Sequence, residues 1–163
     1  MSFSFAMRDT YVFEGPGLKL KRADHHIRNF ELALSDFTRD HGHRVVVHRQ
    51  GKDEPFFFEI LFDAPLPSDL SLMLSDAIHN LRTALDHATW ELLGIDGAIR
   101  NRHTKLPTGN NRASFEAMCK GIETPRQDTI SFLRSLAVHP KGGGEPLYWL
   151  AQLDNAEKHT ILS

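Results

Sequence analysis

The fold is decided by one stretch, from Leu70 to Leu93, which reads Leu-Ser-Leu-Met-Leu-Ser-Asp-Ala-Ile-His-Asn-Leu-Arg-Thr-Ala-Leu-Asp-His-Ala-Thr-Trp-Glu-Leu-Leu. At about 100° per residue, this stretch forms one long helix with an apolar stripe and a polar stripe. The apolar stripe contains Leu70, Ala77, Leu81, Ala84, Leu85, Ala88 and Leu92, and the polar stripe contains Asp76, His79, Asn80, Thr83, Asp86 and His87. Exposed helix faces more often carry Lys and Glu, so short polar side chains with two histidines favour a fixed hydrogen-bond network or a site.

A helix and a β-hairpin are predicted before this central helix. Apolar residues at helical spacing predict a helix from about Leu18 to Arg39, and the break Gly15-Pro16-Gly17 precedes it. Two β-rich runs, His43–Arg49 and Pro55–Phe62, flank a Gly-containing turn and predict a hairpin. We expect the aromatic residues of the second run to pack within that hairpin; they are Phe56, Phe57, Phe58 and Phe62.

Three shorter helices are predicted after the central one. Ser68 or Ser71 caps the central helix, which continues to Gly94 and is followed by an irregular connection over residues 95–112. The next helices are expected from a cap at Ser114 to Lys120, from Pro125 to Leu136, and from near Pro146 to the end of the chain. That last pattern is still helical at Ser163, which is compatible with a longer natural protein, and the sequence leaves open whether the natural chain extends further.

These elements predict an α+β protein that is mainly α, with a helical bundle and a β-hairpin inserted between the first helix and the long central helix. We expect a single domain over residues 1–163. Within it, residues 1–40 form the N-terminal segment and first helix, residues 43–63 form the hairpin, and residues 66–163 form the bundle core.

Composition excludes several classes of protein. A net charge of -2 gives no overall basic field, so we do not expect a DNA-binding protein, and RNA would have to be bound by a local patch. The one cysteine, Cys119, excludes an intrachain disulfide framework. No secretory signal pattern and no apolar run of membrane-spanning length occurs, so we expect a cytoplasmic location and no membrane partner.

Ten histidines are scattered along the chain without a compact zinc-binding motif. We therefore predict no metal ligands and no cofactor. A divalent metal held between Asp and His residues of the central and last helices remains a weaker alternative, and Lys158 would repel such an ion.

The last helix places two opposite charges, Asp154 and Lys158, within its apolar arc, and Asn155 and His159 lie about a quarter turn away. A charge that faces a core must either be paired internally or line a site, because an unpaired buried charge costs several kcal/mol. A basic cluster on the first helix contains Lys19, Lys21, Arg22, His25 and Arg28. It could contact phosphates, but interrupting acidic residues favour a solvated face.

Two motifs support a resemblance to known proteins. Asp76–His87 and Leu150–His159 resemble a family of uncharacterised bacterial proteins that pair an HNLRxALDH helix with a later N/D-x-x-KH helix. The segment Lys105–Pro107 corresponds to a Phe-Pro position of that family, and the resemblance covers Pro65 to the C-terminus. More distantly, Arg82–His87 is similar to the Arg-x4-6-His motif of HEPN domains. These are helical bundles that often dimerise and that, in toxins and defence proteins, cleave RNA without metal.

The HEPN resemblance implies that Arg82 and His87 are the catalytic pair, with Arg82 stabilising phosphate charge and His87 acting as an acid or base. Supporting or binding residues are then His79, Asn80, Asp86, Asp154, Asn155, Lys158 and His159. The expected function is binding of RNA or a nucleotide by a homodimer, with metal-independent RNA cleavage as its strongest form. The alternative is a non-catalytic structural or interaction domain in which the Arg-Asp-His-Lys motif is a buried packing network: Arg82 pairs with Asp86, and Asp86, His87, Asp154 and Lys158 together fix the helix register. Whether the chain is an enzyme stays open between these two.

Overall fold

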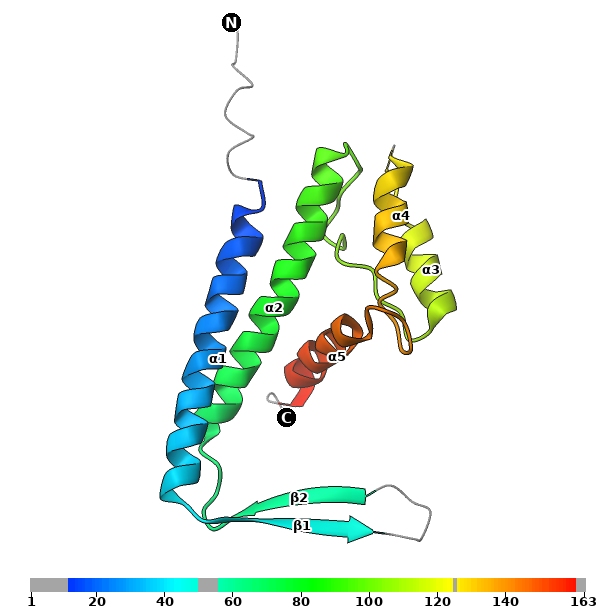
Figure 1. The fold of residues 1–163 in the computed structure, drawn as a ribbon. Coiled ribbons are helices and arrows are strands. Elements are labelled where there is room, and N and C mark those ends of the chain that lie inside the picture. The colour runs from blue at the N-terminus through cyan, green and yellow to red at the C-terminus, as the bar shows by residue number, and fades with distance from the viewer. Residues whose placement is uncertain (1–11, 50–55, 125, 161–163) are drawn as a thin grey trace, which may run out of the picture.

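The computed structural model describes residues 12–49, 56–124 and 126–160, and for Arg49 and residues 157–160 it describes the backbone alone. The elements are α1 (Glu14–Asp40), β1 (His43–Arg49), β2 (Phe56–Phe62), α2 (Ser68–Ile95), α3 (Arg112–Lys120), α4 (Gln127–Ser135) and α5 (Glu145–Thr160). Helices α1 and α2 lie antiparallel and side by side, α5 packs on α2, and α3 and α4 form a pair beyond it (Figure 1). The predicted fold class, α+β and mainly α with a hairpin between the first two helices, is confirmed.

Helix α1 begins at Glu14, before the predicted start at Leu18, so Gly15-Pro16-Gly17 forms its first turn. Proline is favoured there because its fixed φ suits a helix and its missing N–H would have no intrahelical partner. The preceding residue, Phe13, has a φ of 64°, and its backbone N–H donates to the carboxylate of Glu91 on α2. The prediction of a break at these residues was wrong, because proline is tolerated in the first turn of a helix.

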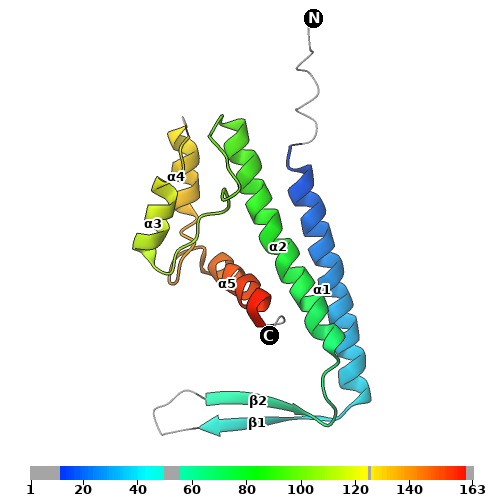
Figure 2. The same cartoon turned by 180° about the vertical axis from the view of Figure 1, so that it is seen from behind.

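Small side chains let α1 and α2 approach each other closely. Ala23 on α1 and Ala77 and Ala84 on α2 are almost fully buried, and the two helices stay side by side along most of their length (Figures 1 and 2). Helix α2 starts at Ser68 after Pro67 without a side-chain cap, so the predicted caps Ser68 and Ser71 were wrong. It ends at Ile95, one residue beyond the predicted end.

Strands β1 and β2 form the predicted antiparallel hairpin, with His43 opposite Phe62 and Arg49 opposite Phe56. The hairpin projects sideways from the base of the α1–α2 pair (Figure 1). At its root the rings of Phe62 and Phe37 meet edge to face with centroids 5.3 Å apart. Phe56, Phe57 and Phe58 are more than half exposed, so the expected packing of the aromatic residues holds only for Phe62.

The hydrophobic core gathers at the C-terminal end of α2, where α3, α4 and their connections cover it. Its buried members are Leu93, Leu106, Phe115, Cys119, Leu133, Val138 and Tyr148. Burial raises the pKa of the Cys119 thiol, and the nearby carboxylate of Glu116 adds to the shift. Helix α3 is capped by Asn111, with Ser114 as the reciprocal partner of a capping box, so the prediction of Ser114 as the cap was wrong by three residues.

The last two helices have nearly the predicted bounds. Helix α4 occupies Gln127–Ser135, and the predicted first residue Pro125 lies outside the described residues. Helix α5 starts at Glu145, one residue before Pro146, and residues 161–163 are outside the described part. The turn before α5 brings Gly144 so close to the carbonyl oxygen of Leu136 that a Cβ could not fit, which explains a glycine there.

Candidate functional site

Arg82 is buried against the segment that follows α2. Only 7% of the residue is exposed, and its Nη2 lies 2.9 Å from Asp86 Oδ1. The same carboxylate oxygen accepts a hydrogen bond from the backbone N–H of Leu106 at 3.0 Å, and Arg82 Nη2 donates to the Leu106 carbonyl at 3.4 Å. Arg82 Nη1 is also buried and has no hydrogen-bond partner among the described residues. The Arg82–Asp86 pair therefore binds both the N–H and the carbonyl of Leu106, a core residue, and so these two charges stabilise the fold.

His79 and Asp154 join the central helix to the last one. His79 Nδ1 lies 3.0 Å from Asp154 Oδ1, and Asp154 is only 3% exposed while half of the His79 side chain is in contact with solvent. Thr83 Oγ1 lies 3.5 Å from the other ring nitrogen of His79. Helix α5 packs on α2 at this point. Asn155 is exposed, and the side chains of Lys158 and His159 lie outside the described residues.

A groove of about 570 Å³ runs between α1 and α2. Its lining residues are Gly15, Leu18, Lys19, Arg22, His26, Asp76, His79, Asn80 and His87, and we refer to this surface as the α1–α2 groove. Lys19 and Arg22 are cations, three further lining residues are histidines, and Asp76 is the one carboxylate among the nine. The groove is thus a local cationic surface on a chain whose net charge is slightly negative.

Hydrogen bonds connect several of the groove side chains. Arg22 Nε donates to His26 Nε2 at 3.1 Å, and the other ring nitrogen of His26 lies 3.9 Å from Asp76 Oδ2. Asn80 is 8% exposed, and its amide donates to the backbone carbonyl of Asp76 at 2.7 Å. Within the groove Arg22, His79 and His87 are exposed, whereas Lys19 and His26 are partly buried.

His87 stands where the groove meets a smaller hollow of about 310 Å³ that Asp86, Trp90, Glu91 and Thr104 also line. A Cβ on Gly15 would lie 3.8 Å from His87 Nδ1, so the first turn of α1 approaches the imidazole closely. Arg82 lines neither hollow. The two predicted catalytic residues therefore lie in different surroundings. His87 is exposed and lines the groove, whereas Arg82 is buried and does not line it.

The basic cluster of the first helix likewise lies only partly in the groove. Lys19 and Arg22 line the groove, whereas Arg28 lies outside it and pairs with Asp24 at 2.9 Å. His26, Leu18 and Gly15 were not among the predicted site residues. The sequence does indicate His26, because Lys19, Arg22 and His26 are spaced three and four residues apart and so lie on one face of the helix.

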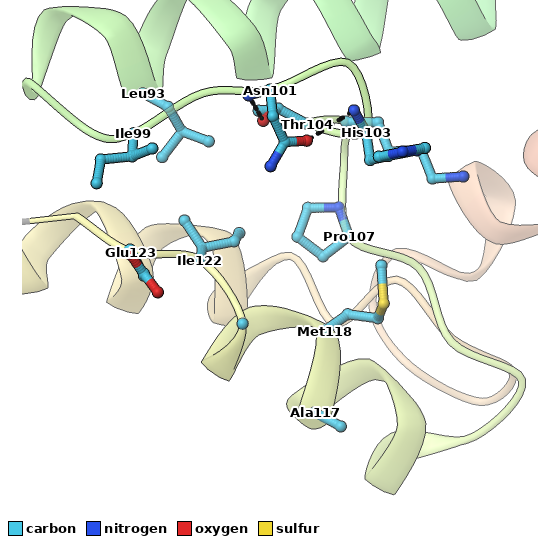
Figure 3. Close-up of a pocket in the computed structure, with 12 residues that line it drawn as sticks. Leu93, Ile99, Asn101, His103, Thr104, Pro107, Ala117, Met118, Ile122 and Glu123 are labelled. Carbon is cyan, nitrogen blue, oxygen red and sulfur yellow. Dashed lines mark hydrogen bonds between the residues drawn. The ribbon is translucent and has the colours of Figure 1, made fainter.

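A further pocket, of about 350 Å³, lies between the connection after α2 and helix α3 (Figure 3). Its walls include Leu93, Ile99, Pro107, Met118 and Ile122, and its rim includes Asn101, His103, Thr104, Lys105 and Glu123. Asn101 and Thr104 are bonded within their own turn, since Thr104 Oγ1 accepts from the Asn101 backbone N–H at 2.9 Å. None of the predicted site residues lines this pocket.

Comparisons with protein-family models, with curated proteins and with solved structures find no match. Within residues 12–49, 56–124 and 126–160, no group of three or more His, Cys, Asp or Glu side chains is arranged to hold a metal ion. The same search range contains no helix with the length and apolar character needed to cross a bilayer.

Proposed function

We propose that this protein binds RNA or a nucleotide through phosphate groups held in the α1–α2 groove. The observation that carries the proposal is the pair of cations Lys19 and Arg22 in the same groove as the exposed imidazole of His87, with Asp76 as the carboxylate among the lining residues. Phosphate oxygens require N–H donors and positive charge, and these side chains supply both. A volume of about 570 Å³ lies within the range of small-molecule sites, so a nucleotide unit can be accommodated.

His87 is the groove residue suited to acid–base catalysis. Its imidazole is exposed and lines the groove, so it is placed to act as an acid or base toward a bound ligand. RNA cleavage with His87 as acid or base is the strongest form of the proposal. Arg82 is bonded to Asp86 and Leu106, so in this form the groove cations Lys19 and Arg22 would neutralise the phosphate charge. The relation to HEPN domains and the cytoplasmic location remain predictions.

The test is RNA binding measured by fluorescence anisotropy with a labelled single-stranded RNA at several salt concentrations. Lys19→Ala combined with Arg22→Ala should weaken binding about tenfold or more and should reduce the salt slope by about one for each phosphate that is no longer neutralised. The matched control is Lys21→Ala with Arg28→Ala, which removes the same charge from α1 outside the groove. Equal weakening by both double variants would mean that only overall charge matters, and the groove assignment would fail.

Whether binding progresses to cleavage is measured separately. The same RNA is incubated with the protein in the presence of a chelator, and the products are separated by electrophoresis. Cleavage that His87→Ala abolishes while binding persists would support the catalytic form. Intact RNA alongside unchanged binding would limit the function to binding.

A second candidate is a non-catalytic structural or interaction domain. The observation that favours it is the bonding of Arg82 and Asp86 to both backbone groups of Leu106, which uses the motif to stabilise the fold. This candidate predicts no measurable affinity for RNA, together with a large loss of stability when the pair is broken. The anisotropy experiment therefore separates the two candidates.

A further inference from the structure

The smaller hollow beside His87 differs in chemistry from the α1–α2 groove. Its volume is about 310 Å³, and its lining residues are Asp86, His87, Trp90, Glu91 and Thr104. Two of the five are carboxylates and one is an indole, whereas the groove contains the cations Lys19 and Arg22. Because His87 lines both cavities, they adjoin at this residue. We call the smaller cavity the Trp90 hollow.

Two carboxylate oxygens of the Trp90 hollow have no hydrogen-bond partner among the described residues. Asp86 uses Oδ1 to bind Arg82 and the Leu106 N–H, which leaves its Oδ2, and 27% of its side chain is exposed. Glu91 uses Oε2 to accept from the Phe13 N–H, which leaves its Oε1. A carboxylate oxygen can only accept a hydrogen bond, so a ligand in this hollow would be bound through N–H or O–H donors.

Thr104 and Trp90 supply different contacts. Thr104 Oγ1 accepts from the Asn101 backbone N–H at 2.9 Å, and its hydroxyl hydrogen can still be donated to a ligand. Trp90 is partly buried, and Arg100 lies over its ring with Cζ 4.8 Å from the centroid. Arg100 does not line the Trp90 hollow, so it leaves the part of Trp90 that lines it uncovered. An open indole next to hydrogen-bonding groups suits a flat aromatic ligand that stacks on it.

We propose that the Trp90 hollow binds a guanine base whose phosphate is held in the α1–α2 groove, an inference that rests on the proposed function. The Watson–Crick edge of guanine has two adjacent donors, N1–H and N2–H, and one acceptor, O6. The free oxygens of Asp86 and Glu91 and the hydroxyl of Thr104 match this set of groups. Adenine, cytosine and uracil each have a single donor on that edge, so each leaves one carboxylate without a donor.

The spacing of residues along the two helices fits one nucleotide. Gly15 of α1 lies beside His87 of α2, since a Cβ on Gly15 would be 3.8 Å from His87 Nδ1. Lys19 is about one turn from this point along α1, and Trp90 is nearly one turn from it along α2. Because the helices are antiparallel, these two residues lie in opposite directions from it (Figure 1). The helical rise then separates Lys19 from Trp90 by about 10 Å, roughly the distance from phosphate to base in one nucleotide.

The charges of the two cavities favour one orientation of this ligand. Asp86 and Glu91 repel a phosphate, whereas Lys19 and Arg22 attract it, so the phosphate should occupy the groove. Asp76, the carboxylate of the groove, lies about two turns of α2 beyond the level of Lys19. The base carries no net charge at neutral pH, and its N–H groups form charge-assisted hydrogen bonds with carboxylates.

The first test compares guanosine monophosphate with inosine monophosphate on the full wild-type chain by isothermal titration calorimetry. The two nucleotides differ only in the N2 amine of the base, so their phosphates contact the groove equally. We expect guanosine monophosphate to bind about tenfold more tightly, because it makes one more hydrogen bond to a charged group. Equal affinities would overturn the guanine assignment, and so would adenosine monophosphate that binds as tightly as guanosine monophosphate.

Glu91→Gln should remove this preference. Glutamine has a single acceptor oxygen, which the Phe13 N–H can occupy, so the amide N–H groups would face the donors of the base. The matched control is Glu31→Gln, which removes the same charge from an exposed residue of α1 outside both cavities and should keep the tenfold preference. A preference that survives Glu91→Gln, or that both variants abolish, contradicts the assignment.

Failure of this inference can be distinguished from failure of the proposed function. Lys19→Ala with Arg22→Ala should weaken both nucleotides by the same factor, because these cations contact the phosphate. If both nucleotides bind equally and both depend on Lys19 and Arg22, the groove binds phosphate and the Trp90 hollow does not bind guanine. If guanosine monophosphate keeps its advantage and neither nucleotide depends on these cations, the groove proposal fails and the phosphate lies elsewhere. Absence of binding by both nucleotides contradicts both proposals.

Discussion

The two flanks of α2 use similar polar residues for different purposes. On the flank that faces residues 105–107, Arg82 and Asp86 are paired with each other and with the backbone of Leu106. On the flank that faces α1, His87 and Asn80 line an open groove together with the cations of α1. Both sets come from one motif of twelve residues, Asp76–His87. Burial and bonding partners, and not residue type or spacing, therefore separate charges that stabilise a fold from charges available to a ligand.

The largest effect is expected at Asp86. Asp86→Ala leaves Arg82 as a buried charge without its carboxylate and removes the acceptor for the Leu106 N–H. We expect the free energy of unfolding to fall by about 3 kcal/mol, as is usual when one partner of a buried ion pair is removed. Chemical denaturation measures this change.

His87→Ala is the matched control for that variant, because it alters the next residue on the groove side of the same helix. Its side chain is exposed, so the expected loss is below about 0.5 kcal/mol. Similar denaturation midpoints for Asp86→Ala and His87→Ala would erase the distinction between the two flanks.

The link between α2 and α5 should be the next largest contribution. His79→Ala removes the imidazole beside Asp154 and should cost about 1.5 kcal/mol, the range of a hydrogen bond to a charged group. In a double-mutant cycle with Asp154→Ala, the coupling energy should be about 1 kcal/mol. The exposed neighbour Asn155→Ala serves as the control and should show no coupling with His79. Additive effects of His79→Ala and Asp154→Ala would show that the 3.0 Å contact contributes nothing to stability.

Most of the fold could be predicted because its signals are local. The 3.6-residue spacing over Leu70–Leu93 and the β-rich runs on either side of residues 50–55 each specify their own element. Some errors were local, since Asn111 caps α3 three residues before the predicted Ser114, and others involve contacts with distant residues. The Phe13 N–H, just before the first turn of α1, donates to Glu91, and no pattern near Phe13 indicates this partner 78 positions away.

The site could be predicted only in part, for a related reason. The polar stripe of α2 was visible in the sequence, but the stripe alone did not indicate that Leu106 would cover one side of it. Helical periodicity describes the helix by itself, whereas α2 is contacted by α1 on one side and by α5 on another. The cations Lys19 and Arg22 form a cluster whose sequence pattern favours a solvated face. The α1–α2 packing makes them one wall of the groove.

A smaller effect on stability is expected from the ionisation of Cys119, a residue of the core that Arg82 and Asp86 help to close. Its pKa is raised in the folded state by burial, so the folded chain binds the thiol proton more tightly than the unfolded chain does. Stability should therefore be unaffected well below the ordinary thiol pKa of about 8.5 and should decline as the pH rises above it. The decline should be absent in Cys119→Ala, and denaturation midpoints between neutral and alkaline pH measure it.

The alkylation rate of the Cys119 thiol should also differ between Asp86→Ala and His87→Ala under native conditions. Alkylation of Cys119 by iodoacetamide should be slow in the wild-type chain, because the side chain is buried and its thiolate is disfavoured. Asp86→Ala should accelerate it by loosening the segment around Leu106, and His87→Ala should not. An equal rate in all three proteins would mean that the ion pair does not help to close the core.

The smallest effect, and the one with the opposite sign, is expected at Asp76, the carboxylate of the groove. It lies 3.9 Å from His26 and is itself exposed, so its loss should change stability by less than about 0.5 kcal/mol. Asp76→Asn keeps the shape of the side chain and removes a charge that repels phosphate. RNA affinity should therefore rise by roughly two- to fivefold at low salt and by less at high salt, where exposed charges are screened.

Asp24→Asn is the matched control for that gain, since Asp24 lies on α1 outside the groove and pairs with Arg28. Both variants change the net charge by the same amount. A gain in affinity restricted to Asp76→Asn would locate the bound phosphates beside His26 and His79. The same gain from Asp24→Asn would mean that RNA responds to the charge of the whole chain. In that case the two flanks of α2 would not differ in ligand binding, even if they differ in their contribution to stability.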